Sequence, residues 1–373
     1  MHRLIVSLAT FLSISSLCFA SSVVEVLYLA QPQGNGASLS TYKVNPKTAA
    51  AEPIGTSLNI PASSLVPLTI GGTHLLYVWN STDVWMYKTN PSGVPRKQPS
   101  QHLSFGFAHP VQSFLVDPDG KFAYAAVTWY DPQNYSFNTQ MMLFTIDSAT
   151  GKLTNTGQSA ANYGPSEYFP LNAIFFLGSR ARLYVEQADD GPHSCGAAYY
   201  YYPVNQKTGM LGTLNYLVGW GDCGVMEVGA VSDRLTVVSD ARFGPGSGSV
   251  VINNLTSGQQ ILCGPSMAAF CGDETNGLTF DPVSRNLFFW DYDTNQVNLG
   301  HINWPSDQLV ATSAFILGQP MLFFSPDSKL VYAIGENDVE IYAFASASGT
   351  FRASTSFTRT SGAFSVATAT LRN

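Results

Sequence analysis

The chain repeats one short pattern roughly seven times, and this repetition constrains its fold more than any other feature. The clearest copy is Phe114-Leu-Val-Asp-Pro-Asp-Gly-Lys-Phe-Ala-Tyr124, followed by Leu143-Phe-Thr-Ile-Asp-Ser-Ala-Thr-Gly-Lys-Leu153. A degenerate copy is Leu322-Phe-Phe-Ser-Pro-Asp-Ser-Lys-Leu-Val-Tyr332, followed by Ile341-Tyr-Ala-Phe-Ala-Ser-Ala-Ser-Gly-Thr-Phe351. One such unit cannot bury its own apolar face, so the copies must pack on one another. The repeat therefore predicts a domain made of similar units in contact.

The spacing of the copies indicates what each unit is. The last aromatic residue of each first hairpin, or its equivalent, marks a copy: Tyr28, Tyr77, Tyr124, Tyr184, Thr236, Phe288 and Tyr332. Successive markers are 49, 47, 60, 52, 52 and 44 residues apart, which is close to the length of a four-stranded propeller blade. Apolar runs between turns of Asp, Pro, Gly and Ser indicate strands, and helical periodicity is nearly absent. We predict an all-β fold, a seven-bladed β-propeller of four-stranded blades.

The two ends of the repeat region are incomplete in complementary ways. Val23–Leu29 aligns with a second strand and has no first strand before it, whereas Ala363–Leu371 aligns with a first strand and has no second after it. We expect these segments to pair in one blade and to close the ring, because closure removes two exposed edges. The expected organisation is a signal peptide over residues 1–20 and a single propeller domain over residues 21–373.

The N-terminus has the three parts of a secretory signal. Met1-His-Arg3 precedes an apolar stretch that reaches Leu17, and Cys18-Phe-Ala20 follows as a cleavage site. Cleavage after Ala20 predicts a secreted or periplasmic protein. The apolar run is too short and too rich in serine for a membrane span. Lipidation at Cys18 is the alternative, and the large Leu17 before it argues against that.

Four cysteines remain after this cleavage: Cys195, Cys223, Cys263 and Cys271. An even number in an exported chain suggests disulfides, and three pairings are possible. Cys263 and Cys271 lie in one short connection, and Cys195 and Cys223 lie in loops expected on one face. We predict the pairs Cys263–Cys271 and Cys195–Cys223. A metal site is the alternative, but no Cys-x-x-Cys spacing supports it.

Three segments carry a family resemblance: His109-Pro-Val-Gln-Ser-Phe-Leu-Val-Asp-Pro-Asp-Gly120, Asp147-Ser-Ala-Thr-Gly-Lys-Leu153 and Val204-Asn-Gln-Lys-Thr-Gly-Met-Leu211. With them the chain resembles the seven-bladed lactonase family, the propellers related to bacterial 6-phosphogluconolactonase, and more loosely the YVTN propellers. The resemblance implies lactone hydrolysis, in which a base activates water against an ester carbonyl and a cation or N–H donors hold the oxyanion. The matching residues are turn and core positions, and no catalytic motif of the family can be placed residue by residue.

Charge is sparse and acidic, with 18 Lys and Arg against 25 Asp and Glu. This balance disfavours nucleic acid and anionic membranes as partners. In a propeller the longer loops share one face and the tight turns share the other. Most bases fall on the turn face and many acids on the loop face, where Arg242 is the one clear base. Such a loop face suits a small neutral or cationic ligand, or calcium as a cofactor; alternatively its carboxylates are solvated turns. We expect a monomer.

The candidate catalytic residues are those expected to converge at the channel mouth. Glu167 and Glu227 lie just before or within inner strands, where crowding and partial desolvation suit a general base. His109 lies in the connection into the third blade, and Arg242 is the electropositive partner. A lone histidine can instead be a hydrogen-bonded loop residue. The predicted ligand-binding residues on the same face are His193, Asp189, Asp190, Asp240 and Glu274.

Two functions remain open at this stage. The first is hydrolysis of a neutral sugar lactone, because an acidic face repels a phosphate and an exported chain does not meet a cytoplasmic metabolite. The second is a non-catalytic extracytoplasmic module that binds a small ligand, calcium or a protein.

Overall fold

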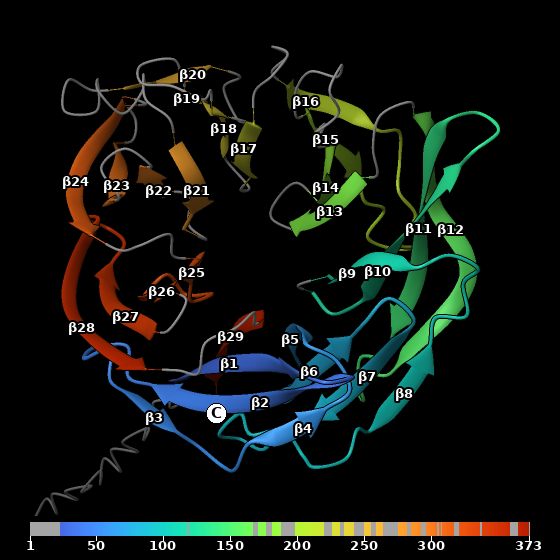
Figure 1. Cartoon of the computed structure of the whole chain (residues 1–373), viewed down its shortest axis with the longest axis horizontal. Coiled ribbons are helices and arrows are strands. Elements are labelled where there is room, and N and C mark those ends of the chain that lie inside the picture. The colour runs from blue at the N-terminus through green and yellow to red at the C-terminus, as the bar shows by residue number, and fades with distance from the viewer. Residues whose placement is uncertain are drawn as a thin grey trace, which may run out of the picture.

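The computed structural model shows sheets that follow one another around a common axis (Figure 1). It describes residues 23–117, 119–166, 171–176, 181–187, 198–219, 226–231, 235–241, 250–254, 259–263, 275–281, 285–291, 296–303, 306, 308–316, 321–335, 338–358 and 365–372. Over these ranges the chain forms 29 strands and no α-helix, so none of them holds a helix that could cross a membrane. The all-β prediction is confirmed.

The strands form four-stranded antiparallel units in chain order. The first sheet contains β29 (Ser365–Arg372), β1 (Val23–Gln33), β2 (Gly36–Val44) and β3 (Ala51–Pro53), and β4 (Leu58–Ile60) also pairs with β2. The second contains β5 (Ser64–Ile70), β6 (Thr73–Trp79), β7 (Asp83–Lys88) and β8 (Gln101–Ser104). The third contains β9 (Val111–Val116), β10 (Phe122–Asp131), β11 (Ser136–Ile146) and β12 (Leu153–Ser166). The fourth contains β13 (Leu171–Phe176), β14 (Arg182–Gln187), β15 (Ala198–Pro203) and β16 (Asn215–Gly219).

The remaining strands make an eight-stranded sheet and a four-stranded one. The larger contains β17 (Met226–Val231), β18 (Leu235–Ala241), β19 (Val250–Asn254), β20 (Gln260–Cys263), β24 (Gln308–Ile316), β23 (Gln296–Asn303), β22 (Asn286–Asp291) and β21 (Thr275–Phe280). The smaller contains β25 (Met321–Phe324), β26 (Leu330–Ile334), β27 (Asp338–Ala345) and β28 (Thr350–Thr358).

The described strands thus form six sheets, where the sequence predicted seven four-stranded blades. The eight-stranded sheet consists of two consecutive antiparallel units, β17–β20 and β21–β24. Their last strands meet in parallel, with Leu262 opposite Gln308 and Cys263 opposite Leu309. This edge-to-edge pairing satisfies backbone groups that two separate sheets would leave exposed.

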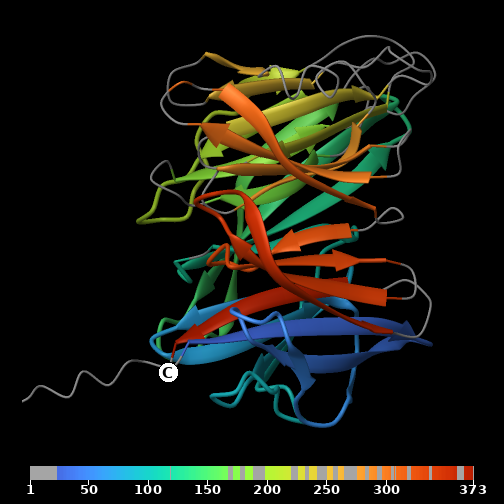
Figure 2. The ribbon, with the colours of Figure 1, turned by 90° about the vertical axis from the view of Figure 1, so that its left-hand side faces the viewer.

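The two ends of the chain lie in one sheet. β29 pairs antiparallel with β1, from Val23 opposite Arg372 to Ala30 opposite Ser365. Both views show the C-terminal strands beside the N-terminal ones (Figures 1 and 2). That this pairing is what closes the ring stays a prediction. The proposed signal peptide lies outside the described residues.

The second strand of a unit lies in the core in β1, β6, β10 and β26. Each of these strands has an unbroken run of five or seven buried residues, on both faces of the strand. A strand covered on both sides by neighbouring sheets needs a continuous apolar run, because neither set of alternating side chains faces water. This explains why the second apolar run is the most regular part of the sequence repeat.

A hydrogen bond between neighbouring sheets recurs at the tyrosine that marks the repeat. Its hydroxyl donates to a glycine carbonyl in the third hairpin of the next sheet: Tyr28 to Gly93 at 2.8 Å, Tyr77 to Gly151 at 2.6 Å, and Tyr124 to Gly209 at 2.8 Å. We call these the tyrosine–glycine bonds. Burial raises the pKa of the Tyr77 hydroxyl, so it remains a neutral donor.

The glycine is required on steric grounds as well. Gly151 has a φ of +73°, and a Cβ there would lie 2.0 Å from Cδ1 of Leu75 in the preceding sheet. The turn therefore approaches its neighbour more closely than a side chain allows.

Where the tyrosine is absent, another contact takes its place. Phe288 of β22 has no hydroxyl, and Asn286 bridges the sheets instead. The side-chain amide of Asn286 donates to the carbonyl oxygen of Ser346 at 3.0 Å, and the Ser346 hydroxyl donates to Asp281 Oδ2 at 2.7 Å. His301 Nδ1 lies 2.8 Å from Asn286 Oδ1 and fixes the amide.

Replacing Tyr77 with Phe tests the tyrosine–glycine bond. The change removes one hydroxyl and leaves the Gly151 carbonyl buried without that donor, so we expect a loss of about 1–2 kcal/mol in the free energy of unfolding. Urea denaturation measures it. Tyr135→Phe, at an exposed side chain, is the control and should have no effect. Equal midpoints for both variants would contradict the role of the bond.

Deleting residues 363–373 tests ring closure. The deletion removes Ala367, Ala369 and Leu371 from a core cluster that includes Val26 and Leu76, and it exposes the edge of β1. We expect the whole domain to unfold at clearly lower denaturant, in one transition. Removal of Asn373 alone is the control. A deletion variant as stable as the full chain would refute closure by this strand.

Candidate functional site

A surface pocket of about 320 Å³ lies where the second and third sheets meet. It is formed by the β6–β7 turn and by the connection from β8 to β9. The strand register brings these segments to one end of the sheet, because Trp79 lies opposite Val84 and Asp83 lies opposite Ser104. This is the end at which the longer loops were predicted to lie. The lining residues are Ser81, Thr82, Ser104, Phe105, Gly106, Phe107, Ala108, His109 and Pro110.

The connection is fixed to the turn by backbone hydrogen bonds. The Phe105 N–H donates to Thr82 O at 2.8 Å, and the Val111 N–H donates to Ser81 O at 2.9 Å. The Phe105 side chain is buried and lies parallel to Phe107, with ring centroids 6.0 Å apart. Phe105 belongs to the core cluster shared by the two sheets, so the apolar wall of the pocket is continuous with the core.

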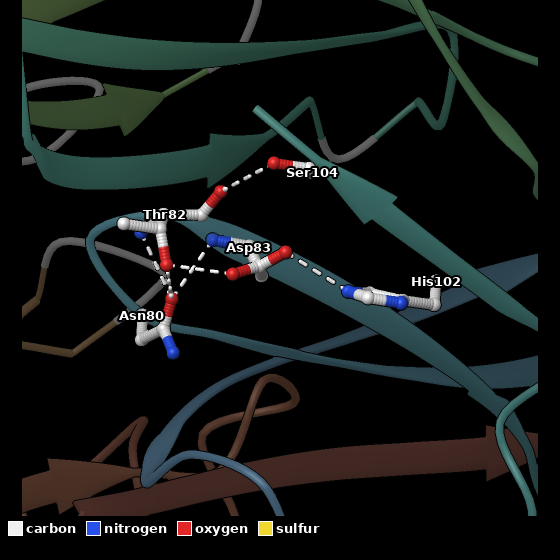
Figure 3. Close-up of polar contacts among 5 residues, drawn as sticks. All are labelled: Asn80, Thr82, Asp83, His102 and Ser104. Atoms are coloured by element: carbon white, nitrogen blue, oxygen red, sulfur yellow. Dashed lines mark hydrogen bonds and ion pairs between the residues drawn. The ribbon is translucent and has the colours of Figure 1, made fainter. Parts of the chain in front are cut away.

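The β6–β7 turn is organised by Asn80 (Figure 3). Its Oδ1 accepts hydrogen bonds from the N–H groups of Thr82 at 2.9 Å and Asp83 at 2.8 Å. A side-chain amide that binds the backbone two and three residues later is a typical way to fix a tight turn. The Thr82 hydroxyl, 2.6 Å from Asp83 Oδ2, donates to that carboxylate.

Asp83 connects the turn to the outermost strand. Its Oδ1 lies 2.9 Å from Nε2 of His102 on β8. The Thr82 hydrogen bond, and then the contact with His102, hold the pKa of Asp83 below its ordinary value against slight desolvation. The His102 ring also stacks on Trp85, its cross-strand neighbour, with centroids 5.0 Å apart and planes 6° apart. The imidazole is therefore held in place on two sides.

His109 lines the pocket, in the connection from β8 to β9. Its side chain is exposed, and its ring lies flat on Trp129 of β10, with centroids 5.1 Å apart and planes 13° apart. Within the described part of the chain no hydrogen bond occupies its ring nitrogens, so the alternative of a hydrogen-bonded loop histidine gains no support. The aromatic contact fixes the plane of the imidazole and leaves its nitrogens available for a ligand or water.

The other predicted catalytic residues are not placed at this pocket. Glu227 lies on β17 and its backbone is opposite Asp240 on β18, but neither side chain is among those described. The remaining predicted residues lie outside the described residues: Glu167, Arg242, His193, Asp189, Asp190 and Glu274. Their convergence at a channel mouth stays a prediction.

The disulfide and calcium predictions also stay open. Cys263 lies on β20 without a described side chain, and Cys195, Cys223 and Cys271 lie outside the described residues. In the described ranges no group of three or more His, Cys, Asp or Glu could hold a metal ion.

Sequence reasoning missed the partners of this site. It counted Asp83 among many loop acids and did not single out His102, Thr82 or Trp129. A signal for the turn was present in Asn80-Ser-Thr-Asp83, because Asn followed by hydroxyl residues is typical of such turns. The stacking partners depend on the strand register, and the sequence alone does not supply it.

The comparisons with known proteins show a β-propeller. The chain is similar to a "putative 6-phosphogluconolactonase" from Bacteroides fragilis, with 13% identity, 90% of this chain and 94% of that chain covered, and a TM-score of 0.53. A protein of the same description from Bacteroides uniformis shares 14% identity, with coverages of 88% and 94% and a TM-score of 0.56. A hypothetical selenium-binding protein from Sulfolobus tokodaii shares 11%, with coverages of 91% and 92% and a TM-score of 0.56.

These similarities establish the architecture and no chemistry. Identities of this size show the fold alone, and the similar structures carry different functional names. No protein-family model and no curated protein matches the chain.

Replacing Asn80 with Ala tests whether the turn shapes the pocket. The change removes the acceptor of two backbone N–H groups, so we expect a loss of about 1 kcal/mol in the free energy of unfolding. It should also broaden the indole NMR signal of Trp85, which stacks on His102. Asn59→Ala, at an exposed position of β4, is the control. Unchanged stability and unchanged Trp85 spectra would show that the turn holds its shape without Asn80.

Proposed function

We propose that this chain is a lactonase-like β-propeller that hydrolyses a small uncharged lactone, with His109 as the general base. The observation that carries the proposal is the exposed His109 imidazole, held flat on Trp129 at the rim of a pocket. A general base must reach the water it deprotonates, and an imidazole with available nitrogens can do so.

Lactone hydrolysis needs a base that activates water and a donor that stabilises the developing negative charge. A neutral His109 nitrogen takes a proton from water as the water oxygen attacks the lactone carbonyl. The ring C–O bond then breaks, and the imidazolium returns the proton to the leaving ring oxygen, which yields a hydroxy acid. Ser81 and Ser104 line the pocket; the Ser104 hydroxyl donates to Thr82 O, and the Ser81 hydroxyl is suited to donate to the carbonyl oxygen as its negative charge develops.

The lining supports an uncharged substrate. None of the nine described lining residues is Lys or Arg, so this pocket offers no counter-charge to a phosphate. The overall charge of −7 adds a weak repulsion of anions. Both features favour a neutral lactone over a phosphorylated one.

We also propose the domain organisation and the export that the sequence predicted. The units β17–β20 and β21–β24 act as two blades of a seven-bladed ring that β29 closes. Residues 1–20 direct export, and the pairs Cys263–Cys271 and Cys195–Cys223 form disulfides.

A non-catalytic binding module is the second candidate. It is favoured by the pocket walls, in which aromatic rings and hydroxyls surround His109 and no Asp or Glu is among the described lining residues. Such walls suit recognition of a small neutral ligand whether or not it reacts.

His109→Asn separates the two candidates. Asn keeps a polar side chain but cannot act as a base, so we expect hydrolysis of neutral lactones to fall by at least about 100-fold. Binding of the same lactones, measured by calorimetry, should be largely kept. Lys97→Gln, exposed at the opposite end of the same sheet, is the control and should leave hydrolysis unchanged. Lactone binding by the unaltered protein without turnover would favour the binding module, and neither binding nor turnover would contradict both candidates.

A further inference from the structure

A buried carboxyl group lies where the two ends of the chain meet. Glu25 of β1 is fully buried and lies opposite Thr370 of β29. The Thr370 hydroxyl donates to Glu25 Oε2 at 2.9 Å. No N–H or O–H group of the described residues donates to Oε1. One half of the carboxyl is thus buried without a donor, which is costly for a charged group.

A second carboxylate faces it from the β25–β26 turn. Asp327 lies within hydrogen-bonding reach of Glu25. Asp327 itself is bound by the Ser325 hydroxyl, which donates to Oδ1 at 2.8 Å, and by the Lys329 ammonium at Oδ2. Two ionised carboxylates are both acceptors, so Glu25 and Asp327 form a hydrogen bond only when a proton lies between them.

The environment places that proton on Glu25. Burial, and then the negative charge of Asp327, raise the pKa of Glu25 to about 7, against the opposing effects of the Thr370 hydrogen bond and the Lys329 charge. For Asp327, the contacts with Lys329 and Ser325 outweigh burial and lower the pKa. Among the described residues these are the charged groups that act on Glu25.

This junction also lacks the tyrosine–glycine bond. Tyr332 of β26 occupies the tyrosine position, and its buried hydroxyl has no hydrogen-bond partner in the described part of the chain. In the next sheet Ala49 takes the place of the glycine, with a φ of +59°, and it packs in the same core cluster as Tyr332. The tyrosine–glycine bond is therefore not made between these two sheets.

We propose that the proton shared by Glu25 and Asp327 is a pH-sensitive contact that holds β1 and β29 against the β25–β26 turn. With the proton present, the neutral Glu25 carboxyl donates to Asp327 and joins three elements. Without it, two negative charges face each other in a buried site and the junction loosens. The inference concerns the assembly of the ring and is independent of the proposed lactonase activity.

The direction of the pH effect follows from the two protonation states. The folded chain holds the Glu25 proton up to about pH 7, whereas an unfolded glutamate releases it near 4.5. Between these values the folded state binds more protons, so its stability falls as pH rises. The contribution of Glu25 is complete below about pH 4.5 and is lost as pH rises through about 7. The unfolding equilibrium constant should increase by up to about tenfold per pH unit within this window.

Glu25→Gln in the full chain is the main test. Gln keeps the shape and supplies a permanent N–H donor to Asp327, so we expect this pH dependence to disappear and stability at about pH 8.5 to rise. Urea denaturation between about pH 5 and about pH 8.5 measures it, and hydrogen exchange of the β29 amides locates it. Glu52→Gln, on the exposed strand β3, is the matched control and should keep the pH dependence of the unaltered chain.

Asp327→Asn provides a second test, because a change in the pH dependence would not be expected if Asp327 had only a structural role. Removing the Asp327 charge should make the loss of stability smaller and make it end at a lower pH, because the charge no longer opposes ionisation of Glu25. Parallel pH profiles of the unaltered chain and Glu25→Gln would overturn the proposal. If Glu25→Gln does not fold, Asp327→Asn decides: a loss of stability that is smaller and ends at a lower pH supports the contact, and an unchanged profile overturns it.

Discussion

The tyrosine–glycine bond is the interaction on which much of this structure depends, because it repeats one buried polar contact between sheets that meet largely through apolar side chains. Tyr28, Tyr77 and Tyr124 each reach a carbonyl in the next sheet. Apolar contacts alone do not fix how far one sheet slides over another, whereas a buried hydroxyl and a buried carbonyl must meet in one register. The glycine allows the close approach. The tyrosine and glycine that recur in the sequence therefore help to fix how closely neighbouring sheets approach and in which register they pack.

The repeat predicted the fold well because both of its signals, the strand pattern within a copy and the similarity between copies, can be read from the sequence alone. Apolar runs separated by turn residues are sufficient to predict strands, and the similarity of the copies is sufficient to predict radial packing. The number of separate sheets was wrong for a different reason. β20 and β24 join through Leu262, Cys263, Gln308 and Leu309, at the outer edges of two units. Pairing between distant edges depends on how the units twist in space, and no local pattern encodes it.

The candidate site was predictable only in part. The place of His109 in a connection between strands follows from the repeat, and its role stays a prediction. Trp129 and His102 were not singled out, because each matters through a ring that lies beside it in space. His102 meets Trp85 across two strands, and His109, just before β9, meets Trp129 of β10, the strand that pairs with β9. The first contact requires the register of β7 and β8, and the second requires the pairing of β9 and β10.

The junction between the last sheet and the first explains why a charged residue can sit in an otherwise apolar core. At three described junctions a tyrosine hydroxyl donates to a glycine carbonyl, but Tyr332 faces a turn in which Ala49 replaces the glycine. The polar link there comes from Glu25, whose neutral form can donate to Asp327 and whose charged form cannot. Burial raises the pKa of the Tyr332 hydroxyl, and the nearby carboxylates raise it further, so the tyrosine does not add a second negative charge. Several described junctions between sheets thus hold permanent hydrogen bonds, whereas the contact proposed where the chain ends meet is titratable. Loss of a single proton then weakens the two terminal strands first, because they alone contribute Glu25 and Thr370.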